Sequence, residues 1–305
     1  MLDYTAVIKM KKQVRGSISL IICTVIWGSS FVAQSVGMDH VGPFTFQAVR
    51  CFLAVIGLLG LILVTDRFQK DGKSFASRWK DKKLWKAGIL CGIPLFFACN
   101  LQQLGIVDTD SGKAAFLTAM YIVIVPIIGI FLKKKPSKMI PVSVSLAVAG
   151  LYCLSCVGVT SISTGDLLLL GCALAFAVQI TVVDIFVNSV DALRLSLIQS
   201  LVCSVLSGII MVFTEEVTWT GISDCWIPLA YSGFLSMGAA YSLQIIGQKD
   251  LEPAAASIIM SLESVFAVIF GWLILHETLT FWEGLGCVLM FIAVILSQLP
   301  DKKKE

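Results

Sequence analysis

Charged residues are scarce in this chain. Of its 305 residues only 14% are Asp, Glu, Lys or Arg, whereas 57% are hydrophobic, and the mean hydropathy is +0.89. A soluble globule of this composition would have too little polar surface to cover itself. The scarcity of charge therefore indicates an integral membrane protein. The formal net charge of +3 says nothing about nucleic acid, and we expect no nucleic-acid partner.

Motifs that carry known enzyme chemistry are also lacking. The sequence has no HExxH, no GxSxG, no glycine loop that would cradle a phosphate and no pair of aspartates at mid-membrane depth. The two histidines, His40 and His276, fall in or near predicted loops, outside any metal-binding spacing. We expect no catalytic residue, no metal and no cofactor. A membrane-embedded lipid-modifying enzyme is the alternative from another class, because ionisable groups in a bilayer also suit catalysis.

Long apolar runs, by contrast, are abundant. A hydrocarbon core of about 30 Å is crossed by a helix of about 20 apolar residues, and the runs are continuous rather than alternating, which favours helices over barrel strands. The sequence predicts an all-α, polytopic membrane protein with ten transmembrane helices. The expected spans are 17–36, 44–65, 86–106, 113–132, 139–157, 166–187, 193–213, 227–246, 253–275 and 280–299.

Lysine and arginine are distributed unevenly among the loops. Of the 23, 21 lie in the two terminal tails or in the loops after the second, fourth, sixth and eighth spans. The alternate loops hold only Lys113, and Arg50 lies inside the second span. The positive-inside rule then predicts a multi-pass protein of the cell membrane with both termini in the cytoplasm, and it supports an even number of spans.

The chain contains an internal repeat. The phrase LQQLG at 101–105 returns as LQIIG at 243–247, each time just before another apolar run. No gap is needed across the stretch that matches at an offset of 142, whereas the first span matches at an offset of 149. The pairs at an offset of 142 are Ala98/Ala240, Leu101/Leu243, Gln102/Gln244, Gly105/Gly247, Ala114/Ala256, Val123/Val265, Ile127/Ile269 and Gly129/Gly271; at an offset of 149 they are Gly16/Gly165, Leu20/Leu169, Cys23/Cys172 and Trp27/Phe176.

This repeat predicts two five-helix units, 1–160 and 161–305. Because five is odd, the second unit enters the bilayer in the opposite orientation to the first, which makes the repeat an inverted one. Two units related by a pseudo-twofold axis in the membrane plane can exchange conformations, so that a cavity open to one side becomes open to the other. The duplication thus predicts transport by alternating access.

Three segments carry a resemblance to a known family. They are WGSSF (27–31), LQQLGIVDTDSGKAAFLTAMYIVIVP (101–126) and SLESVFAVIFGWLILHETLTFWEGLGCVLM (261–290). Over nearly its whole length the chain resembles the drug/metabolite transporter superfamily and, more narrowly, EamA-type transporters; Glu277 matches an acid of the family pattern, whereas Ser264 stands where that pattern often has proline. The resemblance implies a secondary transporter of small metabolites, often an exporter of amino acids or related solutes, with a central cavity lined by both halves.

Glu263 is an acidic residue at mid-membrane depth. It follows Pro253 by ten residues, so a helix that begins at this proline places Glu263 about 15 Å from its start. A carboxylate there costs about 2.5–3.5 kcal/mol unless it faces water, is protonated or has a partner. Glu263 is therefore a candidate for proton coupling and for binding a substrate amine; the alternative is a protonated side chain that only joins helices. Its partner in the repeat is Tyr121.

Neutral polar side chains inside the spans supply further candidates for a binding cavity. They must face the protein interior, because lipid cannot satisfy hydrogen-bonding groups, and several share a helix face through i,i+3 or i,i+4 spacing. About half are expected to touch the substrate and the rest to bridge helices. With an aromatic wall and the acid included, the candidates are Trp27, Ser30, Gln34, Asn100, Gln103, Tyr121, Gln179, Tyr241, Gln244 and Glu263.

Among the other unusual residues in the spans, Arg50 can have either a structural or a functional role. Arg50 lies about 10 Å from the outer end of a helix that starts at Pro43, shallow enough for its side chain to reach outward. Asp184 and Lys113 are expected at the two membrane boundaries. Pro94 and Pro126 interrupt helix interiors and are candidates either for hinges or for static kinks.

The sequence favours a secondary active transporter that moves small polar metabolites, amino acids or related solutes, out of the cell by alternating access, with proton coupling. The expected partners are a small-molecule substrate and the lipid bilayer. A transporter of larger hydrophobic or lipid-linked cargo is the second alternative beside the lipid-modifying enzyme. A channel is disfavoured because no selectivity ring or filter loop is present.

Overall fold

The computed structural model describes residues 4–69, 74–109, 111–134, 137–155, 163–275 and 280–299, and in these residues every regular element is a helix. The first half contains α1 (Tyr4–Met38), α2 (Pro43–Phe68), α3 (Phe75–Arg78), α4 (Lys82–Val107), α5 (Ser111–Ala119), α6 (Tyr121–Phe131) and α7 (Ile140–Ser155). The second half contains α8 (Thr164–Phe186), α9 (Ala192–Thr214), α10 (Trp219–Asp224), α11 (Trp226–Ala230), the π-helix η1 (Tyr231–Ala240), α12 (Tyr241–Gln248), α13 (Pro253–Met260), α14 (Glu263–Leu275) and α15 (Phe281–Ser297). His276 and Glu277 lie outside the described residues.

Each of the ten predicted spans is helical over most of its described residues, which confirms the expected fold class. Among the residues that the structure describes, seven helical segments are long and apolar enough to cross a membrane by length and composition. Two more, Ile140–Leu154 and Phe281–Ser297, are apolar but shorter. The remaining span, predicted at 227–246, consists of α11, η1 and α12 in succession. This span is helical as predicted, and its middle is π-helical rather than α-helical.

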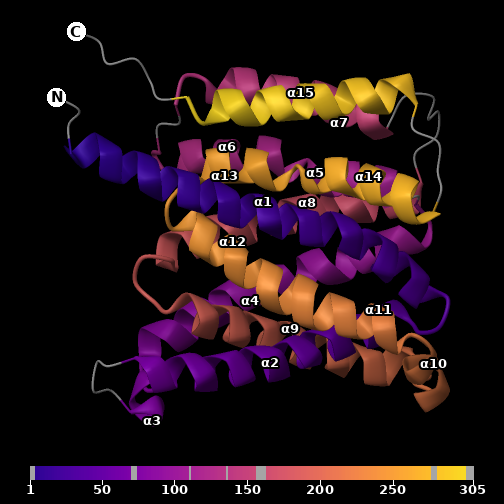
Figure 1. Ribbon diagram of the computed structural model, residues 1–305. Helices are drawn as coiled ribbons and strands as arrows, with labels where there is room; N and C mark the ends of the chain where they lie inside the picture. Colours follow the sequence, from indigo (N-terminus) through magenta and orange to yellow (C-terminus); the bar gives the residue numbers. More distant parts are fainter. Residues whose placement is uncertain are drawn as a thin grey trace, which may run out of the picture.

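The long helices lie side by side, and α1 begins at the same end of the bundle at which α15 ends (Figure 1). Near the start of α1, the Gln13 side-chain nitrogen donates to the backbone and side-chain oxygens of Gln298, each at 3.0 Å. We call this the basic end, because the start of α1, which contains Arg15, and α3, which ends at Arg78, lie there (Figure 1). We call the other end, where α1 ends at Met38, the opposite end. An even number of crossings follows from this arrangement.

Local chemistry explains several helix starts. Pro43 and Pro253 occupy the first turns of α2 and α13, where a missing N–H costs nothing. At the start of α8, Ser163 and Asp166 form a capping box, in which each side chain accepts a hydrogen bond from the other residue's backbone N–H. Thr280 with Glu283 does the same for α15. These caps satisfy N–H groups that the helices themselves leave unpaired.

Two spans are broken at equivalent positions of the repeat. The fourth span is divided at Met120 between α5 and α6, and the ninth is divided at Ser261 and Leu262 between α13 and α14. Residues 120 and 262 are 142 apart, and both breaks contain the same tightened turn: Met120 N–H donates to Leu117 O at 3.3 Å and Leu262 N–H to Ile259 O at 3.0 Å. Pro94 lies inside the unbroken α4, and Pro126 lies inside α6 beyond the break, so the prolines do not mark the breaks.

Pairs of glycines mark two equivalent helix crossings. Gly16 of α1 meets Gly247 of α12 near the basic end, and a Cβ on Gly16 would lie 2.9 Å from Gly247 O. Gly165 of α8 meets Gly105 of α4 near the opposite end, and a Cβ on Gly165 would lie 2.9 Å from Gly105 O. The repeat exchanges one pair for the other, and it exchanges the two ends of the bundle. Such a relation is what an inverted duplication requires.

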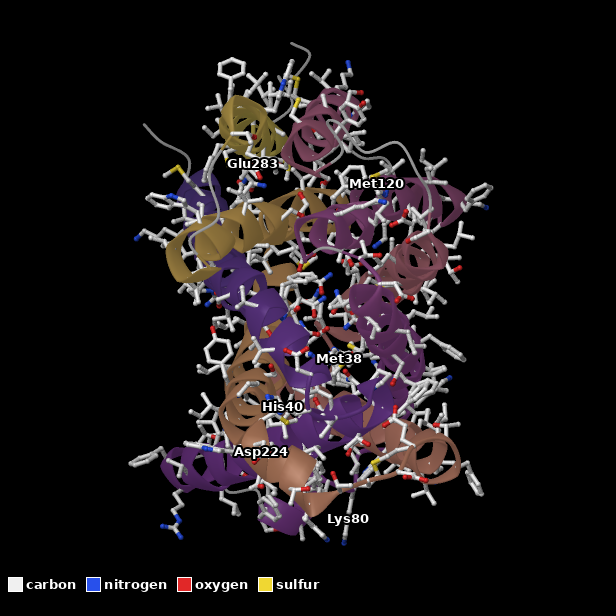
Figure 2. The ribbon with its side chains drawn as sticks, turned by 90° about the vertical axis from the view of Figure 1, so that its right-hand side faces the viewer. Met38, His40, Lys80, Met120, Asp224 and Glu283 are labelled. Atoms are coloured by element: carbon white, nitrogen blue, oxygen red, sulfur yellow. The ribbon has the colours of Figure 1, made fainter. Side chains whose placement is uncertain are left out.

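The α7 and α15 helices form a pair at one edge of the bundle, outside the other helices (Figures 1 and 2). They cross at Gly150 and Gly286, where a Cβ on Gly286 would lie 2.6 Å from Gly150 O. Side chains larger than hydrogen would therefore separate these two helices. The centre of the molecule is left to the first four spans of each half, and polar side chains gather there.

Candidate functional site

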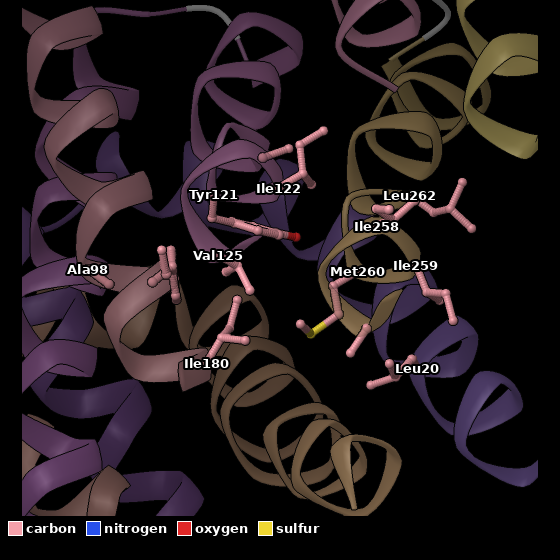
Figure 3. Packing of buried hydrophobic residues seen from close by; sticks show 14 of the residues in the cluster. Leu20, Ala98, Tyr121, Ile122, Val125, Ile180, Ile258, Ile259, Met260 and Leu262 are labelled. Atoms are coloured by element: carbon pink, nitrogen blue, oxygen red, sulfur yellow. The ribbon is translucent and has the colours of Figure 1, made fainter. Parts of the chain in front are cut away.

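The two broken spans meet at the centre of the molecule. Tyr121 and Glu263 are each the first residue after a break, and the Tyr121 hydroxyl donates to Glu263 Oε1 at 3.0 Å. They are also partners in the repeat, 142 residues apart, so the contact joins equivalent positions of the two halves. Figure 3 shows the Tyr121 hydroxyl directed across to the helix that carries Met260 and Leu262. In the described residues no lysine or arginine forms an ion pair with Glu263.

A narrow cavity surrounds this contact and is lined from both halves. Only about 30 Å³ of it is wide enough for water, which is room for about two molecules. Discontinuous helices that bracket a polar cavity at mid-depth are typical of substrate sites in transporters. The lining residues are Trp27, Phe31, Gln34, Arg50, Gln102, Tyr121, Phe176, Ile180, Ser236, Met237, Tyr241, Gln244, Met260 and Glu263.

The structure brings six of the ten candidate residues to this cavity. They are Trp27, Gln34, Tyr121, Tyr241, Gln244 and Glu263. The aromatic wall is formed by Trp27, whose ring centroid lies 4.9 Å from that of Tyr241 and whose Nε1 donates to Ser236 O at 3.4 Å. The next residue, Gly28, lets α14 approach closely, since a Cβ there would lie 2.8 Å from Ala267 N. The WGSSF segment therefore combines a cavity wall with a helix crossing.

The other four candidates are not among the residues that line the cavity; Gln179, Asn100 and Gln103 bridge helices, and Ser30 contacts Gln34 within α1. Gln179 accepts from Gln244 at 3.1 Å and donates to Gln199 at 3.2 Å. Asn100 donates to Ser207 at 2.8 Å. Ser30 and Gln103 both contact Gln34: the Gln34 amide donates to Ser30 O at 3.3 Å, and the Gln103 amide to Gln34 O at 3.5 Å. These bonds hold the lining residues in place without exposing the four side chains to the cavity.

Arg50 corrects an expectation. Its side chain does not reach outward: the residue is only 2% exposed and lines the central cavity. Arg50 Nη1 donates to Gln34 Oε1 and Nε to Gln47 Oε1, both at 2.6 Å, and the guanidinium lies 5.7 Å from the Phe46 ring. The side-chain oxygens of Gln34 in α1 and Gln47 in α2 thus hold the guanidinium inside the protein, and the side chain does not extend to the membrane surface.

Close packing fixes the position of Arg50. A Cβ on Gly233, in the π-helix η1, would lie 2.9 Å from Arg50 O and 2.7 Å from Leu53 Cβ. The α2 and η1 backbones therefore touch at the residue that carries the charge. The π-helix also presents Ser236 and Met237 to the cavity, and π-helical turns are frequent at functional sites.

Larger cavities lie towards each end of the bundle. The one at the opposite end, about 350 Å³, is bordered by Met38, His40 and Thr45 among others. The one at the basic end, about 510 Å³, is bordered by Val125, Lys134, Asp184, Asp250 and neighbouring residues.

Apolar side chains separate the central cavity from the basic-end cavity. Ile180 and Met260 line the central cavity and Val125 lines the basic-end one. Figure 3 shows Val125, Ile180 and Met260 directed into the same space between their helices. Opening this layer would connect the central cavity to the basic end.

Charged residues at the ends of the spans pair with one another. Lys134 forms an ion pair with Asp184 at the basic end, and Lys113 pairs with Asp166 at 2.6 Å at the opposite end. Arg15 binds Asp250 at 2.7 Å. Asp184 and Lys113 therefore lie at opposite ends of their spans, as expected for boundary residues. In the part of the chain that the structure describes, no group of three or more His, Cys, Asp or Glu is placed to hold a metal ion.

Two of the lining residues that sequence reasoning missed were marked by the repeat. Gln102 pairs with Gln244 and Phe176 with Trp27, and each second member was already a candidate. If the repeat partner of each candidate had also been chosen, Gln244 would have selected Gln102, which lines the cavity, whereas Gln103 does not. Arg50 was noticed, but its role was left open and its side chain was expected to point outward. Phe31, Ile180, Ser236, Met237 and Met260 had no distinguishing signal, because apolar and small residues occur throughout the spans.

A multi-pass helical membrane protein, built from two duplicated halves around a central polar cavity, belongs to the class of transporters. The particular family follows from comparison with known proteins: the sequence profile of the EamA-like transporter family matches residues 14–156 and again residues 163–299. The chain therefore belongs to the EamA-like transporter family, within the drug/metabolite transporter superfamily. The resemblance noted in the sequence is confirmed, and the enzyme alternative is excluded by this membership.

Similar proteins support the same conclusion. A protein of Archaeoglobus fulgidus, described as an uncharacterized transporter, is 31% identical over 94% of this chain and 87% of its own length. The uncharacterized transporter YoaV of Bacillus subtilis is 24% identical over 96% of this chain and 100% of its own. One solved crystal structure matches 93% of this chain and 96% of its own with a TM-score of 0.76 and 14% identity; this likeness shows the fold alone.

Proposed function

We propose that this transporter carries small polar metabolites, amino acids or related solutes, out of the cell by alternating access, and that it exchanges them for protons. The observation that carries the proposal is the Tyr121–Glu263 contact, in which the broken spans of opposite halves meet inside a cavity lined by both. Because the halves are related by an inverted repeat, a rearrangement that opens one end has an equivalent that opens the other.

Glu263 supports the coupling part of the proposal. The residue is 4% exposed, and its hydrogen-bond partner in the described residues is the neutral hydroxyl of Tyr121. The other titratable groups around it are the thiols of Cys23 and Cys172. A buried carboxyl group without a cation needs a proton or a cationic ligand. A cargo ammonium and a proton would therefore compete for Glu263, which couples the export of one to the entry of the other.

The lining of the cavity favours polar cargo over the larger hydrophobic or lipid-linked alternative. Gln34, Gln102 and Gln244 present amide groups beside Arg50 and Glu263. A long acyl chain would leave these groups without partners. The remaining polar candidates, Ser30, Asn100, Gln103 and Gln179, are proposed as supports of this lining rather than as substrate ligands.

We also propose that the basic end faces the cytoplasm of the cell, with both termini inside, and that the two units are residues 1–160 and 161–305. The lysine and arginine distribution supports the orientation. The two profile matches, which end at 156 and begin again at 163, support the division. Protease protection of an epitope tag at each terminus in intact cells tests the orientation, and cleavage of either tag from outside would contradict it.

Transport by the full-length protein in liposomes tests the function. Vesicles are loaded with a mixture of radiolabelled amino acids, and efflux is measured with and without a pH gradient. We expect a gradient that drives protons inward to accelerate efflux from wild-type vesicles. Glu263→Gln should lose about tenfold or more of this acceleration, because the amide cannot exchange a proton. Asp224→Asn, at an exposed acid outside the spans, is the matched control and should behave as wild type.

Two results would contradict the proposal. If wild-type vesicles release none of the labelled amino acids faster than empty liposomes do, the cargo class is wrong. If Glu263→Gln responds to the gradient as fully as wild type does, Glu263 has no part in coupling.

A further inference from the structure

Arg50 is a buried cation whose charge has no carboxylate partner among the described residues. The other buried arginine, Arg194, binds Asp66 at 2.5 Å. Arg50 contacts only neutral acceptors, the side-chain oxygens of Gln34 and Gln47. Burying a charged group without an opposite charge is costly. The presence of such a cation beside the central cavity indicates that a ligand supplies the missing negative charge.

The guanidinium lines the cavity, and one of its terminal nitrogens makes no hydrogen bond in the described residues. Its bonds in the described residues use Nε and Nη1, whereas Nη2 takes part in none of them. Arg50 and Gln34 both line the central cavity, so a ligand there can approach Nη2 and displace the Gln34 amide from Nη1. The two terminal nitrogens then form the planar fork that binds a carboxylate through two parallel hydrogen bonds.

The second charged group of the same cavity limits what that anion can be. Glu263 has Oε1 bonded to Tyr121, while Oε2 has no hydrogen bond in the described residues. The Glu263 carboxylate would repel a second negative group in the same cavity, and the repulsion grows with the charge of that group. A phosphate with two negative charges therefore fits this cavity poorly. A small solute with one carboxylate and one ammonium fits both groups at once.

We propose that Arg50 is the anchor for a carboxylate on the cargo, and that the transported solutes are zwitterions whose carboxylate binds Arg50 and whose ammonium group faces Glu263. This inference rests on the proposed function, since it names the cargo of the same cavity. It adds a specificity: amino acids are carried, whereas their carboxamides and the corresponding decarboxylated amines are not.

Liposomes that contain the full-length protein test this specificity. Efflux is compared for a radiolabelled amino-acid mixture, for the matching amino-acid amides and for the matching amines. We expect wild type to carry the acids at least about tenfold faster than the amides or amines, because a site built for a carboxylate is left with an unpaired guanidinium by either analogue. Arg50→Gln should remove this preference, and Arg50→Lys should restore part of it, since the charge returns without the fork.

Gln34→Glu is a second variant that keeps the protein folded. The new carboxylate would lie where the Gln34 oxygen already accepts from Arg50 at 2.6 Å, so it would occupy the guanidinium permanently. We expect the melting temperature of the purified variant to be unchanged or raised, and efflux of the acids to fall about tenfold or more. Gln47→Glu is the matched control, because Gln47 accepts from Arg50 but does not line the cavity. Its new carboxylate would pair with Arg50 through Nε and would leave the terminal nitrogens of the guanidinium free for a ligand.

The outcomes separate this inference from the proposed function. Equal efflux of acids and amides in wild type, or full acid transport by Gln34→Glu, would overturn the role of Arg50 while Glu263-dependent transport still stood. If wild type carries none of the three mixtures, the proposed cargo fails and this inference fails with it.

Discussion

At the residue scale, the site depends on a few contacts that join the two halves. The Tyr121 hydroxyl reaches Glu263 across the repeat axis, and the Cys99 thiol lies 3.5 Å from the Tyr241 hydroxyl, again between residues 142 apart. Contacts between equivalent positions lie on or near the pseudo-twofold axis. A change at one of them therefore acts on both halves together.

Tyr121→Phe tests the first of these contacts. The change removes one hydroxyl and leaves the ring, so we expect a loss of about 1–2 kcal/mol in stability from the lost hydrogen bond. Glu263 would also lose a donor that orients it, and gradient-driven efflux should fall severalfold. Melting of the purified protein and efflux from liposomes provide the two measurements. Wild-type values in both would show that the hydroxyl has no role.

Gly233→Ala tests the close approach of η1 to Arg50. A Cβ there would lie 2.9 Å from Arg50 O, so the helices must separate, and we expect a loss of about 1–3 kcal/mol together with slower transport. Gly60→Ala is the control on α2, where a Cβ meets nothing within 4 Å. That variant should be as stable as wild type or more stable by about 0.5–1 kcal/mol. Thermal melting compares the two, and equal melting temperatures would contradict the steric account.

The direction of the Arg50 side chain shows where sequence reasoning stops. The depth of a residue along a helix follows from counting, and the depth of Arg50 and of Glu263 was predicted in this way. Which way a side chain points depends on partners from distant segments, here Gln34 and Gln47. Without those contacts, the membrane surface was the nearest plausible partner for the charge, and that choice was wrong.

At the element scale, the ten spans were predictable because length and continuous hydrophobicity leave few alternatives in a bilayer. The breaks at Met120 and at Ser261–Leu262 were not, because neither contains glycine or proline. The π-helix η1 had no signal either. It depends on tertiary contacts such as the packing of Gly233 against α2, which a single span does not reveal.

The start of α2 is held by a carboxylate from another helix. Its N-cap residue, Gly42, has no side chain to cap the helix, and Glu215, at the end of α9, accepts from Phe44 N–H at 2.9 Å, Thr45 N–H at 2.8 Å and the Thr45 hydroxyl at 2.6 Å. A negative group at a helix N-terminus also interacts favourably with the helix dipole. Glu215 thus fastens the opposite ends of α2 and α9 together.

Glu215→Gln should weaken this fastening. We expect a loss of about 0.5–2 kcal/mol, the usual effect of removing an N-terminal cap, and faster hydrogen–deuterium exchange in residues 43–46. Glu216→Gln, which changes the next residue along the chain, is the control and should leave both unchanged. Unaltered exchange at the start of α2 in Glu215→Gln would show that the cap contributes nothing.

At the scale of the whole molecule, the two glycine crossings are exchanged by the repeat and lie at opposite ends. A methyl group at Gly247 would press on Leu20, with a Cβ to Leu20 distance of 2.7 Å, and one at Gly105 would press on Leu169 at 2.6 Å. The methyl group at Gly247 would force α12 away from α1, and the one at Gly105 would force α4 away from the equivalent helix α8. The two changes therefore bias the molecule towards opening at different ends.

Gly247→Ala and Gly105→Ala should consequently have opposite effects. We expect Gly247→Ala to increase deuterium uptake around residues 16–20 and 249–252 at the basic end, and Gly105→Ala to increase it around 108–113 and 165–169 at the opposite end. Mass spectrometry of the purified protein after exchange measures both. A rise at the same end in both variants would contradict an equivalence of the two crossings.

Arg50 keeps a positive charge inside the membrane field through every step of the cycle. With a zwitterion bound and Glu263 ionised, the charges of the cavity cancel; with the cavity empty and Glu263 protonated, one positive charge remains. A full elementary charge gains about 2.3 kcal/mol per 100 mV in that field, so under the proposed exchange for protons a potential that is negative inside would draw the empty carrier back to the inward-facing state. Export of an electrically neutral solute would then generate a current and continue on voltage alone, even where the two compartments have the same pH.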